Sequence, residues 1–247
     1  MHDRHLPPLG IGFWTALCLA SVFGANMGDF FAHNLGLGHV KGLPFLAAAF
    51  GLIVLLERFD PLVHEAWYWA AIVTIRTAAT NLGDLLCGDL KLPRSIVMVA
   101  LALALAGVVT LIGRAWQRRG GAENPMRLVL SADAYYWLCM LLAGTLGTVM
   151  GDYFSHNLHL GDAYASIALS LGLGCLFLAG GQGRIWRPAL YWSTVVMVRV
   201  AGTAVGDWFA QRHILGLAIS TATTGLAFVL LLVIQRSLRT RSESPGN

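Results

Sequence analysis

The strongest constraint on the fold is a short pattern that occurs four times along the chain. In each copy a tryptophan precedes an aspartate by 15 residues, and the pairs are Trp14/Asp29, Trp69/Asp84, Trp137/Asp152 and Trp192/Asp207. A glycine stands directly before each aspartate, and a glycine or alanine stands five residues before it. The pattern W-x9-[GA]-x3-G-D recurs too regularly for chance, so we expect four copies of one structural unit.

The four copies are grouped into two duplicated halves. A shift of 123 residues places GANMGDFFAHNLGLG (24–38) on GTVMGDYFSHNLHLG (147–161), with ten identities in fifteen positions. We therefore divide the chain into a first half, residues 1–122, and a second half, residues 123–247, each holding two copies.

Composition places these copies in lipid. Charged residues make up 12% of the chain, against about 25% in soluble domains. Eight apolar stretches are long enough to cross a hydrocarbon core of about 30 Å, although the second and sixth are short. They are 9–33, 42–57, 64–88, 95–114, 131–155, 162–180, 187–211 and 214–235. We predict an all-α integral membrane protein with eight transmembrane helices, embedded in the lipid bilayer.

The topology follows from the even number of spans in each copy. Two spans per copy bring every copy back to the same side, so the four repeats are parallel rather than inverted. Of the 17 Lys and Arg residues, 11 lie on the side of the termini and four on the other side. This bias predicts an inner-membrane protein with both termini in the cytoplasm. It also explains the pI near 9.1 without nucleic acid as a partner.

Parallel copies place the four repeat aspartates at one depth in the membrane, where ionisable side chains mark an ion or substrate pathway by default. Two copies add a histidine four residues later, as Asp29/His33 and Asp152/His156. This spacing puts both side chains on one face of an α-helix, where they can bind a divalent cation. The alternative is a histidine that caps the helix end or meets water. The predicted metal ligands are Asp29, His33, Asp84, Asp152, His156 and Asp207.

Further polar residues share the helix face of the aspartates and are predicted to bind substrate or couple its movement. They are Arg76, Arg199, Thr80, Thr148 and Thr203. The arginines could pair with Asp84 and Asp207 between helices, hold aspartates ionised, act as an internal cation, or bind an anion. A stripe of small residues runs beside this polar face, and such stripes let helices approach closely in lipid. Four helices packed by these stripes would turn their aspartates towards a common interior.

The segments MGDFFAHNLGLG, NLGDLLCGDLKLP, MGDYFSHNLHLG and VGDWF carry a family resemblance. The chain resembles, over 10–235, a family of uncharacterised bacterial membrane-anchored proteins defined by a tandem repeat of unknown function. The resemblance implies the topology and a shared role for Asp29, Asp84, Asp152 and Asp207. It implies no particular activity.

These features predict a secondary transporter or exporter of a small cation, above all a divalent metal, coupled to protons through the aspartates. No P-loop for ATP is present, and the only cofactor expected is a bound divalent metal ion. The alternative is a transporter or binder of a small organic or anionic solute that uses Arg76 and Arg199. An intramembrane aspartyl enzyme is disfavoured because the first glycine of G-x-G-D is missing in every copy. We therefore expect no enzyme, and a homodimer stays open.

Overall fold

The computed structural model describes residues 7–60, 64–118, 133–184, 188–211 and 213–243. Within these ranges the chain is all-helical, with eight α-helices and three short π-helical segments. Four helices carry the repeated tryptophan and aspartate, and we call them the inner helices: α1 (Ile11–Asp29), α3 (Glu65–Asp84), α6 (Ala134–Asp152) and α8 (Pro188–Ala210). The others are the outer helices: α2 (Gly38–Phe59), α4 (Arg94–Arg118), α7 (Gly161–Arg184) and α9 (Leu217–Glu243).

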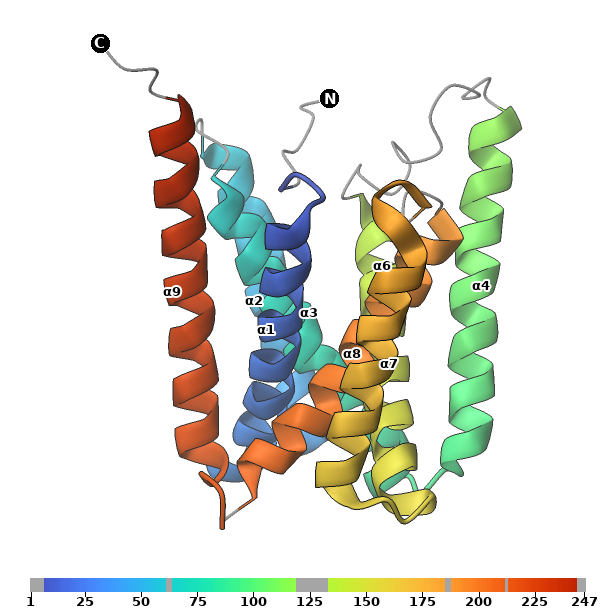
Figure 1. Ribbon diagram of the computed structural model, residues 1–247. Helices are drawn as coiled ribbons and strands as arrows, with labels where there is room; N and C mark the ends of the chain where they lie inside the picture. The colour runs from blue at the N-terminus through green and yellow to red at the C-terminus, as the bar shows by residue number, and fades with distance from the viewer. Residues whose placement is uncertain (1–6, 61–63, 119–132, 185–187, 212, 244–247) are drawn as a thin grey trace.

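The inner helices form a closed ring. In the order α1, α3, α6, α8, each packs against the next, and α8 packs against α1. Every inner helix begins near one end of the bundle, where α9 also ends, and reaches its aspartate near the other (Figure 1). We call these the terminal end and the aspartate end.

The outer helices interlock the four copies. Each outer helix packs against the inner helix of the following copy: α2 against α3, α4 against α6, α7 against α8, and α9 against α1. Figure 1 shows the consequence at the two flanks of the molecule, where α9 and α4 stand on opposite sides of the inner helices. The last helix of each half packs against the other half: α4 contacts α6, and α9 contacts α1. These two helices therefore help to hold the two halves together.

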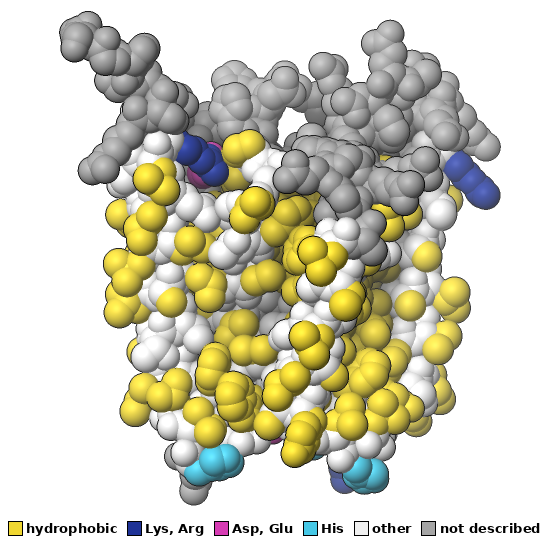
Figure 2. Space-filling model, viewed as in Figure 1, with side chains coloured by type: hydrophobic (Ala, Val, Ile, Leu, Met, Phe, Trp, Pro, Cys, Tyr) yellow, Lys and Arg dark blue, Asp and Glu magenta, His cyan; other side chains and the backbone are white. Residues whose placement is uncertain are grey.

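The surface fits a lipid environment. Seven of the eight α-helices are long and apolar enough to cross a membrane. The outer helices expose large apolar side chains such as Phe45, Leu103 and Leu226, and a surface of this kind would aggregate in water. Figure 2 shows apolar side chains over the middle of the molecule, with basic side chains near its upper edge and histidines near its lower edge. The chain is a multi-pass membrane protein.

The inner helix α3 is the one described α-helix outside these seven spans. It has 20 residues, and its buried face includes Arg76, Thr77, Thr80 and Asn81. Two outer helices also differ from the sequence prediction, which made the second and sixth spans short. The helices α2 and α7 have 22 and 24 residues. Gly38, with φ of +62°, begins α2 directly after the turn, so α2 gains four residues before its predicted start. The extra length of α7 lies at its C-terminal end, which reaches Arg184.

Three inner helices change geometry at the aspartate. Asp29, Asp84 and Asp152 are each followed by a five-residue π-helical segment, namely η1 (Phe30–Asn34), η2 (Leu85–Asp89) and η3 (Tyr153–Asn157). A left-handed residue then turns the chain towards the outer helix; it is Gly36, Lys91 or His159. Single π turns inside helices are frequent at functional sites.

Candidate functional site

The four repeat aspartates converge at the aspartate end of the inner bundle. All four are half-buried, and each carboxylate is within electrostatic reach of the other three. Two basic side chains lie at the outer limit of ion-pair distance: Arg94 Nε is 3.9 Å from Asp152 Oδ2, and His39 Nε2 is 3.9 Å from Asp84 Oδ2. We call Asp29, Asp84, Asp152 and Asp207 the acidic ring.

Close helix packing produces this convergence. The small face of each inner helix packs against the polar face of the next one around the ring. A methyl group on Gly28 would lie 2.7 Å from Thr80 Cβ, and one on Gly151 would lie 2.8 Å from Thr203 Cβ. The same contact joins α3 to α6 at Gly83 and closes the ring from α8 to α1 at Gly202. Each helix therefore keeps its polar face turned inward, as the sequence predicted.

Arg76 lies next to the acidic ring, on the side towards the terminal end, and its side chain reaches all four inner helices. Its guanidinium is fully buried and donates to four oxygens on all four inner helices. These are Ser21 O at 3.3 Å, Thr80 Oγ1 at 2.9 Å, Thr148 Oγ1 at 2.8 Å and Thr203 Oγ1 at 2.6 Å. We call this arrangement the threonine clamp. It brings together four of the five residues that the sequence predicted for coupling or substrate binding.

Arg199 is placed differently, although it stands at the equivalent position of the second half. It is also fully buried, but its one contact is from Nη2 to Met140 Sδ at 4.0 Å, and its Nε and Nη1 have no partner. Met140 lies eight residues before Thr148 on α6, about 12 Å along a helix. The two guanidinium groups thus point in opposite directions, Arg76 towards the acidic ring and Arg199 towards the terminal end.

Neither arginine forms an ion pair with an aspartate. Within the described residues, no aspartate oxygen lies within 4.0 Å of Arg76 or Arg199, although Arg76 interacts electrostatically with Asp29, Asp84 and Asp207 at longer range. The pairs Asp84–Arg76 and Asp207–Arg199, which the sequence left open, are therefore not formed. Neither of these two buried arginines therefore occupies a carboxylate of the acidic ring.

The predicted metal ligands do not form a preformed metal centre. Among the described residues, no three His, Cys, Asp or Glu side chains lie close enough to hold one metal ion. His33 is exposed and faces the ring of His39 at 5.6 Å, while His156 Nδ1 lies 3.2 Å from the main-chain oxygen of Asp152. The π-helical turns after Asp29 and Asp152 take more residues per turn, so a histidine four residues later leaves the aspartate's face. His156 therefore meets its own helix end.

Comparison with known families identifies the repeat. A family model described as a repeat of unknown function, DUF347, matches the chain three times, at residues 12–59, 135–180 and 190–241. The chain belongs to the DUF347 repeat family. The three matches cover the helix pairs α1–α2, α6–α7 and α8–α9, and the pair α3–α4 repeats the same pattern as a further copy. No curated protein and no solved structure matches the chain.

The DUF347 copies also assemble an aromatic cluster at the terminal end, which the sequence reasoning missed. An aromatic residue precedes each repeat tryptophan, namely Phe13, Tyr68, Tyr136 and Tyr191. Three hydroxyls form a chain, with Tyr68 Oη 2.6 Å from Tyr136 Oη and Tyr136 Oη 3.1 Å from Tyr191 Oη. The four repeat tryptophans are buried against this cluster.

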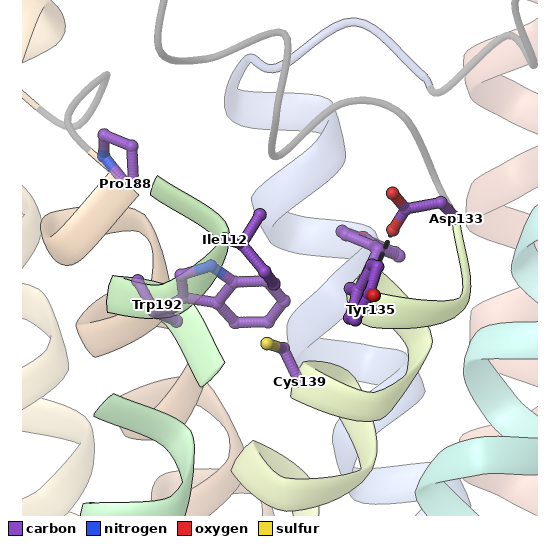
Figure 3. A pocket seen from close by; sticks show the side chains of 8 residues that line it. Ile112, Asp133, Tyr135, Cys139, Pro188 and Trp192 are labelled. Carbon is purple, nitrogen blue, oxygen red and sulfur yellow. Dashed lines mark hydrogen bonds between the residues drawn. The ribbon is translucent and has the colours of Figure 1, made fainter. Parts of the chain in front are cut away.

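A small pocket adjoins the aromatic cluster. It lies between α4, α6 and α8 at the terminal end, and Figure 3 shows Trp192 and Cys139 facing each other across it, with Asp133 at its rim. Tyr136, the central member of the hydroxyl chain, also lines it. The DUF347 bundle thus has an acidic layer at one end, two buried arginines in the middle and an aromatic layer at the other end.

Proposed function

We propose that the protein is a secondary transporter of a small cation, and that the acidic ring is its recognition site. The observation that supports this most strongly is the convergence of four carboxylates from four parallel helices at one end of the bundle. Rings of acidic side chains concentrate cations and select for them in membrane pathways. Each of the four copies of the repeat contributes one aspartate to this ring.

The preferred substrate is a hydrated divalent cation. The four carboxylates interact electrostatically with one another, yet the described residues bring no three metal-ligating side chains close enough for direct ligation. An ion that keeps part of its water shell suits this spacing, because waters bridge the ion to carboxylates that do not touch it. Mg²⁺ binds proteins in this way, through one or two carboxylates and several waters.

The threonine clamp is the gate of this pathway, on the side of the acidic ring that faces the terminal end. Its guanidinium carries a positive charge in the path of the ion and interacts with Asp29, Asp84 and Asp207. A divalent cation in the ring competes for those carboxylates and weakens their attraction for Arg76. A proton taken up by one aspartate does the same, which couples the two ions through one site.

The membrane placement completes the proposal. All eight α-helices cross the bilayer, including α3, because it lies within the ring between α1 and α6 and buries its polar face there. The Lys and Arg bias supports an inner-membrane protein with both termini in the cytoplasm. The acidic ring then faces the outside.

Flux in proteoliposomes tests the proposal. We expect the wild type to move a divalent cation in a panel of Mg²⁺, Mn²⁺, Co²⁺ and Zn²⁺, and to move protons in response to that ion. Asp29→Asn and Asp152→Asn should each lower the flux at least tenfold. The matched control is Asp133→Asn at the terminal end, where the carboxylate caps α6 by accepting from Tyr136 N at 3.0 Å and asparagine caps equally well. Equal flux in all four proteins, or none in wild type for any cation, contradicts the proposal.

The alternative solute, organic or anionic, has weaker support. Arg76 already donates to three hydroxyls and a carbonyl. Of the two arginines, only Arg199 therefore has N–H groups without a partner that could bind a solute. In the same flux assay this alternative predicts uptake of an anion that survives substitution of the acidic ring and is lost with Arg199→Gln.

A further inference from the structure

Arg199 has a buried charge that the protein itself does not satisfy. Its side chain is 0% exposed, and Nε and Nη1 lack any hydrogen-bond partner. Buried polar groups are nearly always hydrogen-bonded, and an isolated buried charge is strongly unfavourable unless a counter-charge or a ligand accompanies it. The sulfur of Met140 at 4.0 Å is only a weak acceptor. Something else is needed to satisfy this guanidinium.

The duplication shows why the two arginines differ. The shift of 123 residues that maps Arg76 on Arg199 maps Thr148 on Ala25, which has no hydroxyl. It maps Thr203 on Thr80, whose hydroxyl already accepts from Arg76. Of the three threonine hydroxyls that hold Arg76, one therefore has no counterpart for Arg199, and the counterparts of the other two, Thr80 and Thr203, already accept from Arg76. The guanidinium turns away from the threonine clamp and towards the terminal end.

At that end Arg199 lies near hydroxyl groups that can both donate and accept, but its Nε and Nη1 bond to none of them. Its strongest electrostatic partners are Tyr68, Tyr136, Tyr191 and Cys18. Three tyrosine hydroxyls carry three hydrogens, and the two bonds of their chain use two of them, which leaves one donor free. The indole Nε1 of Trp137 in the same layer is buried without a partner as well. This region therefore has several unused donors, and no described carboxylate lies within 4.0 Å of Arg199.

From this placement we propose that the protein binds a small monovalent anion between Arg199 and the Tyr68–Tyr136–Tyr191 hydroxyl chain. A halide ion and the carboxylate of a small organic acid share the needed chemistry, which is one negative charge and acceptors only. The pocket at the terminal end is lined by Tyr136 and so adjoins the hydroxyl chain at its central residue. The anion supplies the counter-charge and the hydrogen-bond acceptors that Arg199 lacks among the described residues.

Anion-dependent stability tests this site. The protein is purified in detergent with gluconate as the only anion, and its thermal unfolding is followed while chloride, bromide or acetate is added with the same cation. We expect the unfolding midpoint to rise in a saturable way and isothermal titration to give about one anion per chain. The halide and acetate arms show which source of negative charge the site accepts. Gluconate, a larger and strongly hydrated carboxylate, serves as the reference anion against which the smaller anions are compared.

Arg199→Gln should abolish the saturable shift, while Arg94→Gln, which removes a cation at the aspartate end, should keep it. If Arg199→Gln does not fold, Tyr136→Phe gives the test instead, because it removes the central hydroxyl at constant ring size and should weaken anion binding about tenfold. The proposal is overturned if wild type shows no saturable shift with any of the anions, or if the shift is unchanged in Arg199→Gln or in Tyr136→Phe. It does not rest on cation transport, since the anion titration needs no flux.

Discussion

A methyl group added at Gly147 tests one of the closest helix contacts in the bundle. The substitution Gly147→Ala would place Cβ 2.3 Å from Arg199 Cβ, 2.9 Å from Arg199 C and 3.0 Å from the main-chain nitrogen of Val200. Ordinary Cβ contacts begin near 3.4 Å. Because the clashing atoms belong to the backbone and Cβ of α8, no side-chain rotation relieves the contact. The helices α6 and α8 must move apart by about 1 Å.

Two opposing terms set the size of the effect. Alanine is favoured over glycine inside a helix by about 1 kcal/mol, whereas overpacking of a tight contact costs about 1–3 kcal/mol, and more when the backbone must move. We take the upper part of that range, since three atoms of α8 are involved, and expect a net loss of about 2 kcal/mol. For a chain of this size 1 kcal/mol corresponds to about 2–4 °C in the unfolding midpoint, so Gly147→Ala should lower it by about 4–8 °C.

Thermal unfolding in detergent measures this change against a matched control. Gly107→Ala lies in the outer helix α4, where an added methyl meets no atom within 4 Å, so only the helix-propensity gain applies and the midpoint should stay the same or rise. Gly24→Ala, the equivalent of Gly147→Ala in the first half, meets Arg76 Cγ at 2.5 Å and should also be destabilising. A Gly147→Ala protein as stable as Gly107→Ala would refute the close approach of α6 and α8.

Three further changes test other contacts. Thr148→Val removes an acceptor of the Arg76 guanidinium and should cost about 1–3 kcal/mol in thermal unfolding, whereas Thr145→Val, whose hydroxyl bonds only Leu141 O of its own helix, should cost less than about 1 kcal/mol. Lys91→Gly relieves a left-handed residue with φ of 55° and should stabilise by about 1 kcal/mol; a destabilised variant would show that Lys91 makes compensating contacts. Ser220→Ala leaves the Asn26 amide without its 2.5 Å partner on α9 and should destabilise the protein by about 1–3 kcal/mol. An unchanged unfolding midpoint would show that this bond does not hold α9 against α1.

The inner ring could be predicted from sequence because its determinants are local and repeated. A small residue five positions before an aspartate and a glycine directly before it fix, by helical periodicity alone, which face packs and which face carries the carboxylate. Gly24 against Arg76 and Gly147 against Arg199 are equivalent contacts in the two halves. The convergence of the four aspartates then follows from four helices with this shared pattern packed in a ring.

Other features depended on geometry that the pattern does not contain. The Asp-x3-His spacing assumes a continuous α-helix, and the π-helical turns after Asp29 and Asp152 remove that assumption. The opposite directions of Arg76 and Arg199 depend on which hydroxyls neighbouring helices offer, since Thr148 is replaced by Ala25 in the other half. The pairing of each outer helix with the following copy has no local signal in the sequence.

The most direct test of the account is the binding of Mn²⁺ to the purified protein, followed by electron paramagnetic resonance. Convergent carboxylates predict one Mn²⁺ site per chain, weakened by each of the four single aspartate-to-asparagine substitutions. One charge about 8 Å from a divalent ion contributes about 2 kcal/mol at an effective dielectric constant of about 40, so each substitution should weaken binding more than tenfold. Binding that depends on one aspartate alone, or several independent sites, would contradict a shared acidic ring.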